Sequence, residues 1–169
     1  MAYILAKFGK RRYESLISFL VVGSADLCQK VSQGLHQSVK GRQWNIVVHQ
    51  CEFVNEVVKV EVDITVDFII FVFDWRFQSL SEVEANINLI DEHYIIAGAT
   101  CLVNCKETSS SMGLISHKSA KLRNKYNIRF LSANVSKLQS CVQLGNRILN
   151  IAEAILGITS GIPTIGFSI

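Results

Sequence analysis

The chain has 169 residues, of which 49% are hydrophobic and 18% charged, with a net charge of +3 and a single proline. This composition excludes a disordered or low-complexity chain, and the length fits one domain with a sizeable core. No apolar run approaches the roughly 20 residues that span a bilayer, so we expect no membrane segment.

The first half of the chain predicts three strands and one helix. After a basic N-terminal extension, residues 1–15, the run Leu16–Val22 is apolar throughout and predicts a buried strand. Asp26–Gly34 then begins a helical pattern. Asn45–His49 and Val57–Val62 predict two more strands, and the second of these alternates valines with charged residues, as an edge strand does.

A central strand and a helix follow. Asp67–Asp74 places six consecutive apolar residues between two carboxylates, which indicates a strand buried on both faces. Ser79–Glu82 reads SLSE, a capping box that predicts the start of a helix. The inner face of this helix is expected to carry Leu80, Val83, Ile87 and Ile90.

The last part of the chain predicts two strands and two helices. Ala99–Asn104 and Ile128–Ala133 are the strands, and a helix between them ends near Asn127. The final helix is expected from about Ser136 to Leu156, with Gly157 as its C-cap. Its inner face would carry Leu138, Cys141, Val142, Gly145, Ile148, Leu149, Ala152 and Ile155.

Alternating strands and helices predict an α/β fold. We expect a mostly parallel six-stranded sheet with helices on both faces and an antiparallel edge formed by the second and third strands. This is the order of a small-GTPase-like (Ras-like) domain. The domain would span residues 16–157 and leave an apolar C-terminal tail at 158–169.

The turn after the first strand is where such a domain would bind phosphate. A working phosphate loop reads G-x-x-x-x-G-K-[ST], but counting from Gly23 places Cys28, Gln29 and Lys30 at the last three positions. Cys28 adds a Cβ where backbone must approach phosphate, Gln29 has no charge, and Lys30 has no oxygen for magnesium. Asp26 adds a carboxylate, either directed into the loop or acting as an N-cap. A close pair of like charges costs about 4 kcal/mol at an effective dielectric near 20, so we expect no bound nucleotide.

The other GTPase motifs are also degenerate. No Asp-x-x-Gly occurs, and the guanine-reading Asn-Lys-x-Asp becomes Asn104-Cys105-Lys106-Glu107, with Asn104 and Glu107 retained in kind. Asn104 has a simpler interpretation as a turn residue at a strand end. Ser132–Asn134 matches the start of the last base-contacting loop.

No group of residues predicts catalysis or a metal site. The four histidines lie in four different elements, and Asp91–His93 is expected to be a solvated helix end. Five cysteines, at 28, 51, 101, 105 and 141, predict reduced, buried thiols in an intracellular compartment. We therefore predict no catalytic residue, no cofactor and no metal.

Three stretches together resemble the centromere protein M family: Phe19–Leu35, Asp67–Asp91 and Ala99–Cys105, with the similarity continuing through Ser116–Val135. The resemblance runs from Phe19 to the C-terminus, is weakest between His36 and Val66, and does not include the basic N-terminal stretch. It implies a nucleotide-free pseudo-GTPase, a structural subunit of the inner kinetochore in the nucleus. It also implies binding to centromere protein I, a helical-repeat protein, together with centromere proteins H and K.

Apolar residues outside the predicted core are candidate partner contacts, namely Leu144, Ile151, Ile158, Ile162, Ile165 and Phe167. The tail could instead fold back on the domain, and it could bury Leu144 and Ile151 beneath it. Other functions remain open: a divergent GTPase with weak guanine binding, a pseudo-GTPase adaptor outside the kinetochore, or a nucleic-acid-binding module using two basic clusters. Direct DNA contact is not expected, because no nucleic-acid-reading motif accompanies those clusters.

Overall fold

The computed structural model of the chain describes residues 16–59, 64–74, 76–106 and 113–158. Its centre is a sheet of five parallel strands in the order β2-β1-β3-β4-β5. The strands are β1 (Leu16–Val22), β2 (Asn45–Cys51), β3 (Phe68–Phe73), β4 (Thr100–Asn104) and β5 (Arg129–Ser132). The predicted α/β class and mostly parallel sheet are confirmed.

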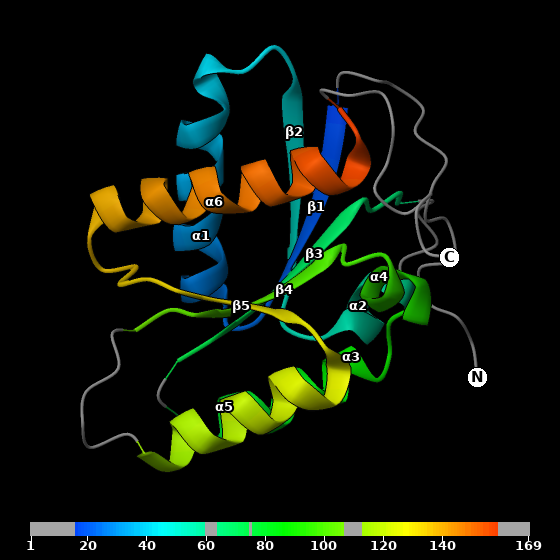
Figure 1. Cartoon of the computed structure of the whole chain (residues 1–169), viewed down its shortest axis with the longest axis vertical. Coiled ribbons are helices and arrows are strands. Elements are labelled where there is room, and N and C mark those ends of the chain that lie inside the picture. Colours follow the sequence, from blue (N-terminus) through cyan, green and yellow to red (C-terminus); the bar gives the residue numbers. More distant parts are fainter. Residues whose placement is uncertain (1–15, 60–63, 75, 107–112, 159–169) are drawn as a thin grey trace.

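Helices cover both faces of this sheet (Figure 1). One face carries α1 (Ala25–Ser38) and α6 (Leu138–Leu156), and the other carries α3 (Phe77–Ile87) and α5 (Gly113–Tyr126). Three short helices complete the described elements, namely η1 (Val39–Gly41), α2 (Val54–Lys59) and α4 (Glu92–Ile96).

The prediction of a sixth strand at Val57–Val62, and with it an antiparallel edge, is wrong. Residues 54–59 form α2, residues 60–63 lie outside the described residues, and all described strand pairs are parallel. The cause is a tertiary contact: the Asn86 side chain accepts from Val54 N at 2.8 Å and donates to Glu52 O at 3.2 Å. Asn86 thereby satisfies a free N–H at the helix start, and Val54 is fully buried.

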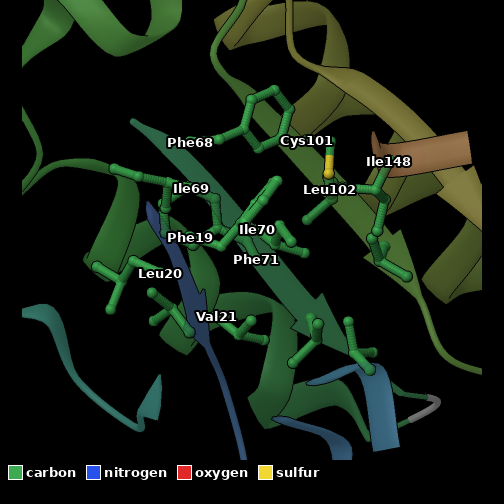
Figure 2. Close-up of a cluster of buried hydrophobic side chains, with 14 of the residues drawn as sticks. Phe19, Leu20, Val21, Phe68, Ile69, Ile70, Phe71, Cys101, Leu102 and Ile148 are labelled. Atoms are coloured by element: carbon green, nitrogen blue, oxygen red, sulfur yellow. The ribbon is translucent and has the colours of Figure 1, made fainter. Parts of the chain in front are cut away.

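The core lies between the sheet and its two helical layers. All six residues of β3 and all five of β4 are buried, as predicted from their apolar runs. The Phe19 and Phe68 rings pack in a tilted pair with centroids 5.8 Å apart. Figure 2 shows this cluster, with side chains from β1, β3, β4 and α6 in one continuous group.

The expected capping box does not start α3. The helix begins two residues before Ser79, with Arg76 as N-cap and no side-chain cap bond. Asp74 causes the earlier start, because its Oδ1 accepts from Arg76 N at 3.0 Å and its carboxylate pairs with Arg76 Nε at 2.9 Å. The residues expected on the inner face of this helix are nevertheless buried: Leu80, Val83 and Ile87 in α3, and Ile90 three residues after its end.

Asp91–His93 begins a helix and does not end one, whereas the expected exposure holds for Glu92 and His93. Asp91 is 9% exposed and N-caps α4, accepting from His93 N at 2.9 Å and contacting His93 Nδ1 at 2.7 Å. The backbone bond from His93 is the main cause of the lowered pKa of Asp91. The same short helix places Tyr94 in the core, where its hydroxyl donates to Val66 O at 2.7 Å.

The last helix matches its prediction except at its start and at two inner-face residues, Leu138 and Val142. It begins at Leu138 and not near Ser136, and Leu138 is 56% exposed. Val142 is half-buried and the other predicted inner-face residues are buried. Gly157 ends the helix in the left-handed conformation at φ 66°, as predicted.

Candidate functional site

The candidate site is the carboxyl edge of the sheet, where β1 is followed by Gly23 and β3 by Asp74. In parallel sheets of order 2-1-3-4-5, ligands bind at this edge, between the first and third strands. The structure brings the predicted phosphate-loop residues to this place. Their geometry decides whether phosphate could be held.

Gly23 is required by packing. Its φ is 152°, a conformation that favours glycine, and its N–H donates to Cys51 O at 3.0 Å. A Cβ at this position would lie 2.4 Å from Val72 Cγ2 and 2.7 Å from Val72 O. The first glycine of the motif therefore has a structural cause that needs no phosphate.

The turn between β1 and α1 is too short to form a cradle. Only Gly23 and Ser24 separate the strand from the helix, which begins at Ala25. Cys28 N donates to Ser24 O at 3.0 Å, so the backbone donor at the second-glycine position is used within the helix. A phosphate loop needs these N–H groups turned toward its ligand.

Side chains of α1 occupy the remaining positions. Cys28 is 1% exposed, and its thiol lies 3.3 Å from Gly23 O and 3.6 Å from Val21 O. Burial, reinforced by Cys51 and Glu52, raises the pKa of Cys28 to about 12, so the thiol stays neutral. Gln29 is exposed and presents no charge at the lysine position.

Asp26 does not point into the loop, nor does it cap the helix. Ser24 is the N-cap, and the Asp26 side chain is 71% exposed. Its Oδ2 lies 2.9 Å from Lys30 Nζ, and this bond is the main cause of the raised pKa of Lys30. The pair neutralises the one cation of the degenerate motif on the helix surface.

The side chains at the positions of the guanine-reading motifs, Asn104 and Asn134, accept hydrogen bonds from backbone N–H groups two residues later. Asn104 is 7% exposed at the end of β4, and its Oδ1 accepts from Lys106 N at 3.2 Å. Asn134 Oδ1 accepts from Ser136 N at 3.1 Å in the turn after β5. These bonds fit the interpretation of Asn104 as a turn residue, while Glu107 lies outside the described residues.

The carboxyl edge carries a group of thiols that the sequence analysis did not bring together. Burial raises the pKa of Cys105, and nearby Cys28, Asp74 and Cys141 add to the effect. Cys141 donates to Val135 O at 3.2 Å. All five cysteines are free, and among the described residues no group of His, Cys, Asp and Glu could hold a metal. The positions of these thiols in the chain explain why they are close. Cys105 directly follows β4, and Cys28 and Cys141 lie in the first turns of α1 and α6. A correct topology would therefore have predicted that the three thiols lie near one another.

The candidate partner contacts are placed only in part. Leu144 is 1% exposed and belongs to the core, which leaves it no surface for a partner. Ile151 and Ile158 are half-buried and pack against the core. Ile162, Ile165 and Phe167 lie outside the described residues.

No helix in the described ranges has the length and apolar character to cross a bilayer. Comparison with models of protein families finds no match, and comparison with curated proteins finds none either.

Proposed function

We propose that this chain is a nucleotide-free pseudo-GTPase. The observation that carries the proposal is the two-residue turn Gly23–Ser24, followed by a helix whose buried Cys28 stands at a phosphate-loop position. The five parallel strands correspond to a Ras-like sheet without its antiparallel edge strand. The chain has the sheet and helices of such a domain, and buried side chains such as Cys28 fill the carboxyl edge where a nucleotide would bind.

The role we propose is that of a non-catalytic structural subunit of the inner kinetochore, located in the nucleus at the centromere. It rests on the resemblance of Phe19–Leu35, Asp67–Asp91 and Ala99–Cys105 to the centromere protein M family. In this role the chain stabilises the helical-repeat body of centromere protein I, alongside centromere proteins H and K. The fold supports this role in one respect: a rigid sheet with two helical layers can serve as a docking platform without any chemistry.

Two experiments separate the two halves of the proposal. Labelled GTP with magnesium, titrated against the purified chain to high micromolar concentration, should show no saturable binding. Saturable, magnesium-dependent binding would contradict the pseudo-GTPase and favour a divergent GTPase.

The kinetochore role is tested by affinity purification from mitotic extract, read by mass spectrometry. We expect centromere proteins I, H and K at comparable abundance, together with a soluble complex when the four chains are co-expressed. Recovery of trafficking factors instead would leave the pseudo-GTPase intact and place the adaptor outside the kinetochore.

A further inference from the structure

Among the residues that the structure describes, no strand pairs with the outer edge of β2. Within the described residues β2 pairs with β1 alone and lies at the end of the sheet. Edge strands of soluble proteins usually carry a lysine, a proline or a bulge that prevents further pairing. The seven residues of β2 read NIVVHQC, with neither a charge nor a proline, and Val47 is 37% exposed.

The register shows which backbone groups face this edge. Cys51 O accepts from Gly23 N, while the register partner of Cys51 is Val22. In a parallel ladder, a residue bonded in this way directs both its N–H and its C=O toward the neighbouring strand, and the residues beside it direct theirs away. Every second residue from Asn45 to Cys51 therefore faces β1. The groups of Ile46, Val48 and Gln50 face outward.

We propose that a second copy of this chain binds this edge through its own β2, antiparallel, with the two-fold axis at Val48. Val48 then stands opposite Val48 of the second copy, and Ile46 stands opposite Gln50. When the backbone groups of two directly opposed residues face each other, the pair is joined by two backbone hydrogen bonds. The outward-facing residues are symmetric about Val48, so one register satisfies all of them. The inference does not rest on the proposed function.

The absence of charge favours a second copy over an unrelated strand. Around a two-fold axis each side chain meets a copy of its own surroundings, so any charge near the axis would face a like charge. On α1, beside β2, the exposed side chains include Gln29, Gln33 and Gln37, and His36 is the exposed titratable group of its last turn. Its one lysine, Lys30, is paired with Asp26 of the same helix.

The mass of the full chain in solution tests the proposal. Light scattering after size exclusion should show the mass rising from 18.9 kDa to twice that value as concentration increases. Val47→Lys adds an edge lysine at an exposed position and should keep the chain monomeric at every concentration. Leu138→Lys is the matched control, because it charges an exposed leucine of α6 and should dimerise as the wild type does.

A cross-link tests the register. Val48→Cys places two thiols on directly opposed residues about 5.5 Å apart at Cα, within disulfide reach, and mild oxidation should give a covalent dimer on a non-reducing gel. Ile46→Cys places its two copies roughly 14 Å apart and should give only the background of the native cysteines. The proposal would be overturned if the wild type stays monomeric, or if Val47→Lys dimerises as the wild type does. Equal cross-linking of Val48→Cys and Ile46→Cys would also overturn it.

Discussion

The two helical layers of this molecule are joined in different ways. On one face α1 and α6 touch backbone to backbone, because Gly34 and Gly145 lie at their crossing. A Cβ on Gly34 would lie 2.3 Å from Cys141 O, and one on Gly145 would lie 2.5 Å from Gly34 O. This layer is a continuation of the core, with no room for even one added methyl group.

On the other face α3 and α5 are joined by long polar side chains. Lys118 Nζ lies 3.2 Å from Ser81 Oγ and Lys125 Nζ lies 2.8 Å from Glu84 Oε1. Tyr126 also donates to Asn88 Oδ1 at 2.7 Å. Exposed contacts of this kind contribute little to stability. The α1–α6 face should therefore fix the global stability, while the α3–α5 face can change its contacts at small cost.

Gly145→Ala is expected to have the largest effect. The new Cβ would meet the backbone of α1, so the two helices would have to separate, and we expect a loss of about 3 kcal/mol in the free energy of unfolding. Urea denaturation measures this loss. Gly113→Ala is the matched control, because no described atom lies within 4 Å of a Cβ added there, and the stability of this variant should be nearly unchanged. A Gly145→Ala variant as stable as the control would show that the helices do not cross this closely.

Arg42→Ala should have the next largest effect. The guanidinium lies against the Trp44 ring, pairs with Glu153 at 2.5 Å and donates to Asn150 at 2.6 Å, with the Arg42 side chain 17% exposed. Loss of a partly buried charged bond costs about 2 kcal/mol. Arg147→Ala changes an exposed arginine of α6 and should be nearly neutral by the same urea measurement. Equal losses in the two variants would mean that the anchoring of α6 by Arg42 is unimportant.

Ser38→Ala tests a smaller link in the same layer. Its hydroxyl lies 2.7 Å from Gly34 O and 2.8 Å from Val142 O, so it joins α1 to α6 close to the glycine crossing. Removing it should cost about 1 kcal/mol. Ser136→Ala is the matched control, because it removes the hydroxyl of an exposed serine that lies before α6, and it should be nearly neutral. If the alanine variant unfolds at the wild-type urea midpoint, the bridge contributes nothing.

Predicting the fold from sequence succeeded where burial alone determines the residue pattern. A strand covered on both faces, such as β3, must be apolar throughout, and that pattern is visible in Phe68–Phe73. The sequence around Val57 fits two patterns. The valines at 54, 57 and 58 have helical spacing, whereas those at 58, 60 and 62 alternate as in a strand. Asn86, distant in sequence, decides for the helix, and local analysis could not include it.

The candidate site was predictable in composition and not in shape. The residue types at Cys28, Gln29 and Lys30 were sufficient to predict a degenerate phosphate loop. The predicted strand Leu16–Val22 and helix from Asp26 already imply a turn of about three residues, close to the two that the structure has. Counting along the motif assumed a longer loop, and that assumption was wrong. The same assumption misplaced Asp26, which lies one turn before Lys30 on the surface of α1.

The smallest expected effect belongs to the α3–α5 face, and its pH dependence identifies it. The hydrogen bond from Lys125 is the main cause that lowers the pKa of Glu84 from its ordinary value of 4.5. The folded pKa lies below the unfolded one, so the pair stabilises the fold above pH 4.5 and loses this contribution as pH falls through the folded pKa. Glu84→Gln should therefore cost about 0.5 kcal/mol at pH 7, and less in high salt.

Urea midpoints of wild type and Glu84→Gln at pH 7 and pH 3 measure this difference, which should be smaller at the lower pH. A difference that is undiminished at pH 3 would mean that the side chain acts through packing and not through charge. A loss at pH 7 as large as that of Arg42→Ala would show that the α3–α5 face is as firmly joined as the α1–α6 face. The opposite result, a small and acid-sensitive loss, leaves global stability with the glycine crossing.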